Sequence, residues 1–262
     1  MYQPRLYREK IGKTRFRYFT TSYLETDLWI GIDPGSYHEE IEAFTLNKII
    51  ELRKILENYG RKNNEFLRSF SPVESTTGAP GIIREMTSVS NVSGSGPMAS
   101  VAGAFAQFIG RSIIKKYNVN ELIIENGGDC FIKIKEPLNI SVFAGNSPFS
   151  GKTGLSVTPE YSPLGICTSS GRFGHSTSFG KADAVMVACK NTLLADAYAT
   201  IFCNKIRRES DMKSVLAEIK LKKLILAAIL IFRKKIGITG NFKFKLFDEG
   251  LVTNQCVWVK KL

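Results

Sequence analysis

The chain has 262 residues, of which 44% are hydrophobic and 23% charged, as in an ordinary globular protein rather than a disordered one. Its formal net charge of +12 favours polyanions or phosphorylated ligands, although many cytosolic proteins are simply basic. Five cysteines stand singly with no CxxC pair, which argues against a zinc site or a thioredoxin-type redox motif. Nucleic acid remains a minor alternative, because neither an RNA-recognition motif nor zinc-finger spacing is present.

The sequence shows no signal for export and no membrane span. Residues 1–13 are charged from the start and lack the apolar core of a signal peptide. The most hydrophobic run, residues 224–232, is about half as long as a bilayer span requires, and lysines flank it. We therefore expect a cytoplasmic protein without a transmembrane segment, and the single cysteines fit that reducing compartment.

The N-terminal part predicts two strands followed by a helix. Residues 14–32 alternate between apolar and polar side chains, as two consecutive strands do. A helix is expected over residues 43–59, with Gly60 as its stop. The polar stretch 61–80 is expected to cover the surface.

The middle of the chain begins with a glycine-and-serine loop at residues 90–96 (SNVSGSG). A helix follows from Pro97, and its first half is made of small and apolar residues, so it is expected to be buried on most sides. The pattern then changes to short strands separated by turns. These strands are predicted at residues 121–125, 130–134, 139–143, 155–158, 165–168 and 184–189.

Two helices are predicted after these strands, at residues 192–207 and 211–235. The order of elements indicates an α+β fold, with mainly antiparallel sheets packed against helices. We expect one domain over residues 1–262, with two closely packed subdomains as the alternative arrangement.

Asp196 and Thr200 lie four residues apart on a predicted helix and therefore share one face. A carboxylate on an otherwise apolar helix is costly unless it is paired or binds a cation. One carboxylate and one hydroxyl, completed by water and substrate phosphate, suit Mg²⁺. The alternative is an Asp that caps a neighbouring loop, with Thr200 bonded back to its own helix.

The loop at residues 168–183 (TSSGRFGHSTSFGKAD) combines three glycines with six serines and threonines. Backbone N–H groups at glycines can converge on an anion, and Lys181 can complete such a cradle. His175 can act as a general base, because its reference pKa lies near neutral pH. The alternative is an exposed surface loop with an exposed histidine.

Asn126, Gly127, Gly128 and Asp129 follow a predicted buried strand. Two successive glycines mark a turn that needs positive φ or a close approach to another group, and a simple hairpin turn is the alternative. The loop before Pro97 is a further candidate, because a helix N-terminus attracts anions. An ordinary loop and helix cap explains that segment equally well.

Three blocks occur in order along the chain: ENGGD at 125–129, TSSGRFGHS at 168–176 and ADAYAT at 195–200. Together they resemble the Gly-Gly-Asp loop, the Thr-Ser-Gly segment leading to a histidine, and the metal-binding helix of the ApbE-like superfamily. The best-known members of that superfamily are FAD:protein FMN transferases. ETDL at 25–28 and GPMASVAGA at 96–104 are similar to an uncharacterised branch of it.

The resemblance implies that Asp196 and Thr200 bind Mg²⁺ and that His175 activates an acceptor hydroxyl. It also implies a pocket for FAD or FMN, with another phosphorylated small molecule as the alternative ligand. The residues expected to form this pocket, from the resemblance and from the loop composition, are Asn126, Gly127, Gly128, Asp129, Thr168, Ser169, Ser170, Gly171 and Lys181.

The expected function is that of a Mg²⁺-dependent enzyme that transfers FMN from FAD to a hydroxyl, as on an acceptor protein, or hydrolyses FAD to FMN and AMP. The transferases hold the flavin with a Lys-Gly-Tyr-Ala-Val-Asp segment, where this chain has PMASVAGA. The alternative is therefore a non-catalytic ligand-binding or accessory protein of the same scaffold. Relatives of the branch in methane-forming archaea are implicated in sulfur and homocysteine metabolism. The oligomeric state is left open.

Overall fold

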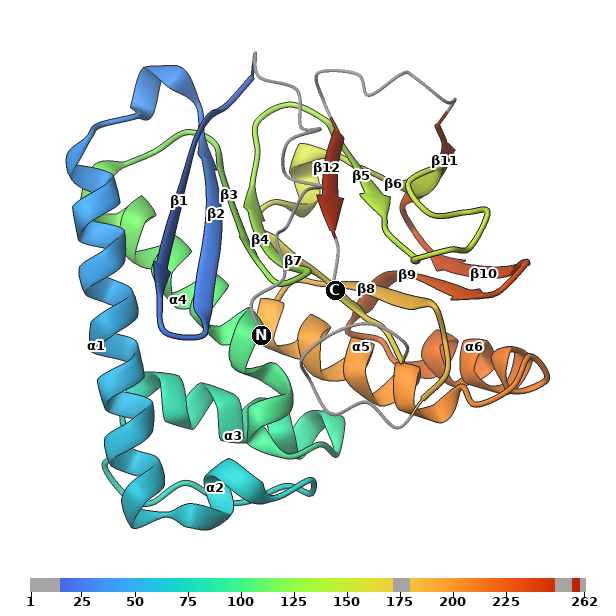
Figure 1. The fold of residues 1–262 in the computed structure, drawn as a ribbon, viewed down its shortest axis with the longest axis horizontal. Helices are drawn as coiled ribbons and strands as arrows, with labels where there is room; N and C mark the ends of the chain where they lie inside the picture. Colours follow the sequence, from blue (N-terminus) through green and yellow to red (C-terminus); the bar gives the residue numbers. More distant parts are fainter. Residues whose placement is uncertain (1–14, 172–179, 248–255, 260–262) are drawn as a thin grey trace.

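The computed structural model describes residues 15–171, 180–247 and 256–259 (Figure 1). The helices within these residues are α1 (Glu40–Lys62), α2 (Asn64–Arg68), α3 (Gly81–Ser93), α4 (Val101–Tyr117), α5 (Thr192–Lys205) and α6 (Asp211–Leu221), with short 3-10 helices η2 (Pro34–Ser36), η3 (Pro97–Ser100) and η4 (Pro159–Tyr161). The strands are β1 (Arg17–Tyr23), β2 (Thr26–Ile32), β3 (Leu122–Asn126), β4 (Asp129–Lys133), β5 (Leu138–Val142), β6 (Thr153–Val157), β7 (Leu164–Ser169), β8 (Ala184–Cys189), β9 (Ile225–Phe232), β10 (Lys235–Gly240), β11 (Lys243–Leu246) and β12 (Cys256–Val259). The expected α+β class is confirmed.

The strands form two sheets. Eight strands pair in the order β1-β2-β3-β4-β7-β8-β9-β10, and every neighbouring pair is antiparallel. The second sheet has the order β11-β6-β5-β12, in which β12 and β5 run parallel. Most neighbours in the large sheet are also consecutive in the chain, and short turns join β1 to β2, β3 to β4 and β9 to β10, as antiparallel pairing permits. The prediction of mainly antiparallel sheets is confirmed.

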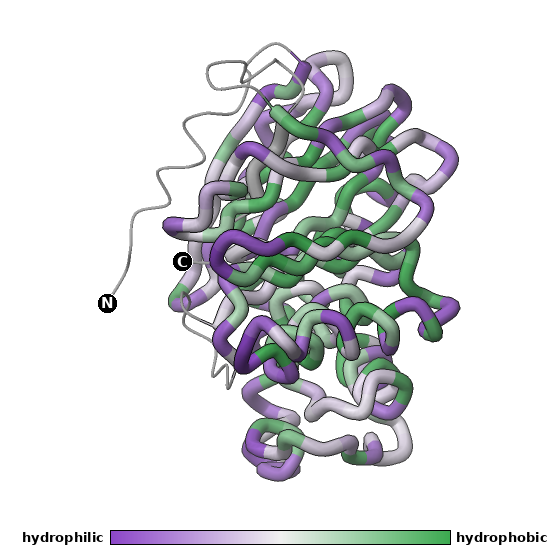
Figure 2. Tube along the Cα trace, turned by 90° about the vertical axis from the view of Figure 1, so that its right-hand side faces the viewer, coloured by the Kyte–Doolittle hydropathy of each residue, from purple (hydrophilic) through white to green (hydrophobic). Residues whose placement is uncertain are grey.

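The eight-stranded sheet is the middle of three layers (Figure 1). Successive side chains of a strand point to opposite faces, so each strand contributes to two cores. In β3, Leu122 and Ile124 pack under the helices, whereas Ile123 packs against the four-stranded sheet. Figure 2 shows the resulting pattern, with hydrophobic strand segments inside and hydrophilic segments around them.

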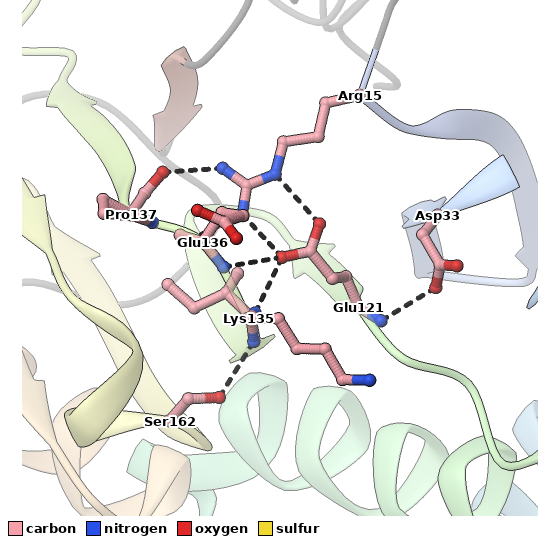
Figure 3. A network of polar contacts seen from close by, with 8 residues as sticks. Arg15, Asp33, Glu121, Lys135, Glu136, Pro137 and Ser162 are labelled. Atoms are coloured by element: carbon pink, nitrogen blue, oxygen red, sulfur yellow. Dashed lines mark hydrogen bonds and ion pairs between the residues drawn. The ribbon is translucent and has the colours of Figure 1, made fainter. Parts of the chain in front are cut away.

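A polar network fixes the start of β1 to the connection between β4 and β5 (Figure 3). The Arg15 guanidinium donates to both carboxylate oxygens of Glu121, at 2.9 Å from Nε and 2.6 Å from Nη2. It also donates to the carbonyl oxygens of Glu136 and Pro137, each at 2.6 Å. Glu121 Oε1 accepts a further bond from the Lys135 N–H at 2.7 Å. The network holds the N-terminal strand in register at the edge of the sheet.

The region after residue 210 differs from the prediction of one long helix over residues 211–235. Helix α6 ends at Leu221, and the apolar run that follows forms β9, which pairs with β8 and β10. A continuously apolar run has no periodicity that separates a buried strand from a buried helix. Pairing with β8 satisfies its backbone, so the strand forms. In the part of the chain that the structure describes, no helix is long and apolar enough to span a bilayer.

Two predicted helix boundaries were also wrong. Gly60 lies inside α1, which ends only where Asn63 donates its backbone N–H to Tyr59 O at 2.9 Å. The predicted loop at residues 90–96 is shorter, because α3 continues until Gly94 ends it with a φ of 84°. In both places packing of the helix against its neighbours outweighed the local glycine or serine signal.

Candidate functional site

Two of the predicted pocket segments lie side by side at one end of the inner strands β3, β4 and β7 of the large sheet. The turn at Gly127 and Gly128 joins β3 to β4, and β7 is the other neighbour of β4. Thr168, near the end of β7, donates its backbone N–H to Gly128 O at 3.0 Å. Asp129 lies opposite Cys167 in the register of β4 and β7. The antiparallel pairing thus places the two segments side by side.

The turn between β3 and β4 is tightly constrained. Gly127 and Gly128 have φ values of 65° and 107°, which side chains rarely permit. The Gly128 N–H donates to Glu125 Oε1 at 2.8 Å. Asn126 Nδ2 donates to Ala102 O at 3.1 Å, and this bond ties the turn to the first turn of α4. The turn is therefore fixed to a helix as well as to the sheet.

A backbone N–H group of helix α4 also donates a hydrogen bond to the predicted metal-binding carboxylate. Asp196 lies on α5 with 3% of its surface exposed, and its Oδ2 accepts the Gly103 N–H at 2.9 Å. A Cβ atom at Gly103 would lie 2.7 Å from Thr192 O and 3.0 Å from Asp196 Cβ. Glycine is therefore required for the two helices to approach this closely, and that approach brings the N–H to the carboxylate.

Asp129 and Asp196 lie around the same buried thiol. Burial raises the pKa of Cys167 well above its ordinary value, and the Asp129 and Asp196 carboxylates raise that pKa further. The Cys167 Sγ donates to Thr192 O at 3.4 Å, so the thiol stays protonated and inert. Two carboxylates from different elements therefore create a negative potential between the sheet and α5, and such a potential attracts a cation.

The N-terminus of α5 is already satisfied by protein groups. Asn191 Oδ1 accepts the Leu194 N–H at 3.0 Å, and Gln107 Oε1 accepts the Thr192 N–H at 2.8 Å. A helix N-terminus binds anions through N–H groups without other partners. These two N–H groups of α5 are therefore used within the protein and do not face an anion.

The other predicted pocket residues follow β7. Ser169 and Thr168 are 1% exposed, and their hydroxyls have no hydrogen-bond partner among the described residues. Thr168 shares a strand face with the core between the sheets, so its hydroxyl lies on the side away from α5. Ser170 is buried, and the Gly171 N–H donates to Ala182 O at 2.9 Å. Ser169, rather than Thr168, is on the face of the sheet that carries the carboxylates.

The loop bearing the predicted histidine begins and ends beside α5. A Cβ at Gly171 would lie 2.2 Å from Gly180 O, and one at Gly180 would lie 1.8 Å from Cys203 O. Lys181 is exposed and donates its backbone N–H to Ile206 O at 2.7 Å. His175 lies outside the described residues. Both stems of the loop are thus close to the last turn of α5.

The oxygen donors on α5 suit a magnesium ion that is shared with a substrate. Thr200 is half-buried and follows Asp196 by one helical turn. Among residues 15–171 and 180–247, no three His, Cys, Asp or Glu side chains are grouped to hold a metal ion. Mg²⁺ typically uses one or two carboxylates and takes its other ligands from water and substrate phosphates. Asp196 and Thr200 could supply two oxygen ligands of such a set, and the other ligands would have to come from water and substrate.

Comparison with known proteins shows the family to which the chain belongs. A family model described as "AbpE bacteria" matches residues 8–232. The chain belongs to this ApbE-like family. A UPF0280 protein of Methanocaldococcus jannaschii is 38% identical over 222 residues, which cover 83% of this chain and 88% of the relative. A UPF0280 protein of Methanococcus maripaludis is 40% identical over 185 residues, or 70% of this chain and 73% of the relative.

Solved ApbE structures share the fold of this ApbE-like protein. An ApbE protein from Thermotoga maritima aligns with a TM-score of 0.60 and 10% identity, over 85% of this chain and 96% of that one. The apo form of the flavinyl transferase ApbE from Pseudomonas stutzeri aligns with a TM-score of 0.52 and 13% identity, over 86% and 93%. At these identities the likeness concerns the fold, and the chemistry has to be argued from the residues of this chain.

Three residues near this site were not singled out from the sequence of the ApbE-like protein: Gly103, Gln107 and Cys167. The small residues around Gly103 indicate a close approach to another group, but they do not indicate which group. Gln107 lies one turn beyond Gly103 on α4 and is 1% exposed, so it faces α5 together with Gly103. A buried glutamine in an apolar helix is the signal that could have predicted a structural hydrogen bond here.

Proposed function

We propose that this ApbE-like protein binds a flavin dinucleotide together with Mg²⁺ and transfers FMN to a hydroxyl group, with hydrolysis to FMN and AMP when water is the acceptor. One observation carries the proposal. The Gly127–Gly128 turn lies beside the end of β7, and Asp196 of α5 lies near the same Cys167 thiol as Asp129, directly after the turn. The similarity to structures titled flavin transferases supports it.

In this proposal the backbone at the β3–β4 turn and after β7 lines the pyrophosphate, because glycines let N–H groups approach an anion closely. Asp196 and Thr200 are the proposed magnesium ligands, with the Gly103 N–H orienting the carboxylate. A bound Mg²⁺ would neutralise negative charge that develops on the phosphates.

His175 is proposed, from the family resemblance, as the base of the reaction. It takes the proton of the acceptor hydroxyl while that oxygen forms a bond to the phosphorus on the FMN side. The bond from this phosphorus to the bridging oxygen breaks, and AMP leaves with that oxygen. Asp196 is buried, and low exposure to water strengthens the interaction of a carboxylate with a cation.

The test is a fluorescence titration with FAD, with and without Mg²⁺, followed by chromatography of the nucleotides. We expect tight Mg²⁺-dependent binding and the appearance of AMP with wild-type protein. Asp196→Asn keeps the size of the side chain and removes its charge, so turnover should fall by at least about 100-fold while the fold is retained. Glu57→Gln, an exposed carboxylate on α1, is the matched control. Full activity of Asp196→Asn would rule out the metal assignment.

A second candidate function is binding of a flavin or related ligand without transfer. It is favoured by the segment at residues 97–104, which replaces the flavin-holding segment of the transferases and is used to pack α4 against α5. An intact FAD that stays bound in the presence of Mg²⁺ and an acceptor would support this function. Absence of FAD binding would direct the search to other phosphorylated metabolites.

A further inference from the structure

The positive charge of the protein is concentrated at the end formed by α6, β9 and β10, on the right in Figure 1. Residues 205–247 contain twelve lysines and arginines against three acidic residues, a net +9 of the +12 for the whole chain. Each of the three acidic side chains already has a basic partner in the same region, namely Glu209 with Lys235, Asp211 with Arg208 and Glu218 with Lys205. The other nine basic side chains of residues 205–247 have no further acidic residue within this range to neutralise them.

Two leucines project from the same end. Residues 220–224 (KLKKL), called here the basic turn, comprise the end of α6 and its connection to β9. Leu221 is 80% exposed and Leu224 is 55% exposed, and lysines stand beside both. A single exposed leucine is common on protein surfaces, but two on one lysine-rich turn form an amphipathic feature.

The basic turn is held firmly by the fold. The Lys222 N–H donates to Ile219 O and the Ile225 N–H donates to Lys222 O, each at 3.0 Å. Ile219 is 1% exposed, so the turn starts from a buried position and soon re-enters the sheet. Its leucines are thus presented to solvent by a fixed backbone, not by a loose end.

A neighbouring segment adds to the charge of the basic turn. The Asn241 N–H donates to Leu226 O at 2.8 Å, which places the connection from β10 to β11 next to the start of β9. Lys243 follows directly on this connection and is exposed, as are Lys220 and Lys223. A third exposed lysine therefore follows the segment that lies next to the start of β9.

Composition distinguishes among the partners that such a surface can take. Protein interfaces are enriched in aromatic residues and arginine and depleted in lysine. Single-stranded nucleic acid is bound by stacking of bases on aromatic side chains. The basic turn has lysines with aliphatic leucines and contains no aromatic residue. Phe242 and Phe244, on either side of Lys243, pack into the core between the sheets. Lysines attract anionic headgroups, while short aliphatic side chains enter the boundary between headgroups and acyl chains.

We propose that the basic turn docks the protein reversibly on an anionic lipid surface, with Leu221 and Leu224 entering the headgroup boundary and Lys220, Lys223 and Lys243 contacting the headgroups. This docking does not depend on the proposed flavin chemistry, because the basic turn shares no residue with the candidate site.

Co-sedimentation with vesicles tests the proposal. Phosphatidylcholine vesicles with about a third phosphatidylglycerol should bind the protein, pure phosphatidylcholine should not, and binding should weaken as salt rises. The double variant Lys220→Gln with Lys223→Gln should lower the partition coefficient about 25-fold, from about fivefold for each lysine. The double variant Leu221→Ser with Leu224→Ser should lower it at least about tenfold.

Matched controls keep the test specific. Leu24→Ser changes a leucine that is 66% exposed elsewhere, and Lys54→Gln with Lys115→Gln removes two exposed lysines on α1 and α4. Neither control should change vesicle binding. The proposal is overturned if anionic vesicles do not bind, if the controls weaken binding as much as the basic-turn variants do, or if the leucine variant binds normally. Tighter, salt-sensitive binding to a single-stranded DNA oligomer than to vesicles would overturn it in favour of nucleic acid.

Discussion

The backbone of Gly103 fixes the orientation of the charged side chain of Asp196. The backbone N–H of Gly103 reaches Asp196 Oδ2 at 2.9 Å only because no Cβ separates α4 from the carbonyl oxygen of Thr192. A hydrogen bond from an N–H to a carboxylate stabilises its charged form and fixes its orientation. The same contact therefore orients the proposed magnesium ligand and packs two helices together.

Replacing Gly103 with Ala places a methyl group 2.7 Å from Thr192 O, closer than such contacts allow. Relief of this clash moves α4 away from α5 and withdraws the N–H from Asp196. We expect the free energy of unfolding to fall by about 1–3 kcal/mol, as for other overpacked interiors. FAD binding in the presence of Mg²⁺ should weaken as well. Urea unfolding and the fluorescence titration measure the two effects.

Gly81→Ala is the control for this substitution. At Gly81, the start of α3, the nearest atom to a new methyl group is Phe108 Cε1 at 3.9 Å, an ordinary contact. Alanine favours the helix over glycine, so this variant should be as stable as wild type or slightly more stable. Equal stability of the two variants would show that the close approach at Gly103 has no energetic role.

At the scale of elements, a buried polar network sets the position of α5 against α3 and α4. Gln107 of α4 accepts the Thr192 N–H at 2.8 Å and donates to Glu85 Oε1 of α3 at 2.6 Å. Asn191, the N-cap of α5, donates to the same oxygen of Glu85 at 2.8 Å. Because Asp196 belongs to the second turn of α5, this network also sets the distance of the carboxylate from the sheet.

Gln107→Leu should destabilise the protein by about 1–3 kcal/mol, because it leaves the buried Thr192 N–H without its acceptor and removes one bond to the half-buried Glu85. Ser112→Ala on the same helix removes a hydroxyl that donates to Phe108 O of α4 at 2.8 Å, and should cost much less. Thermal unfolding of the two variants measures and compares their losses of stability. A Gln107→Leu variant no less stable than Ser112→Ala would contradict the role assigned to the network.

At the scale of the whole molecule, stability at acid pH depends on the network that joins the sheet edge to the β4–β5 connection (Figure 3). Burial alone raises the pKa of Glu121, but the Arg15 guanidinium and the N–H groups of Lys135 and Glu136 outweigh it, so the pKa lies below its ordinary value. A carboxyl group with a lowered pKa stabilises the fold above its unfolded-state pKa. That contribution is lost as the pH falls through the folded-state pKa.

Glu121→Gln should therefore lower the free energy of unfolding at pH 7 by about 1–2 kcal/mol, since it removes bonds made by a charged acceptor. The difference from wild type should shrink as the pH falls below about 4, where the wild-type carboxyl group is protonated in the unfolded chain and then in the folded protein. Urea unfolding at pH 7 and at a pH below about 4 measures this difference in the free energy of unfolding. Glu51→Gln, whose partner Lys48 is on the surface of α1, is the control and should change little at either pH. A pH-independent difference for Glu121→Gln would refute the charge-based explanation.

The sequence alone determined the class of the fold and most of its elements, because alternating or helical periodicity marks which side chains face a core. It also placed Asp196 and Thr200 on one helix, since a spacing of four is a local property of that helix. It could not separate strand from helix at residues 225–232, where every residue is apolar and no period exists.

Tertiary structure decided the rest. The Gly127–Gly128 turn and the end of β7 become neighbours only through strand order, and the Gly103 contact with α5 exists only through helix packing. Each depends on groups far apart in the chain, whose pairing no local pattern encodes. The exposure of Leu221 and Leu224 was settled in the same way: the apolar residues after them entered the sheet, whereas these two stayed outside because the turn between α6 and β9 left them no core to enter.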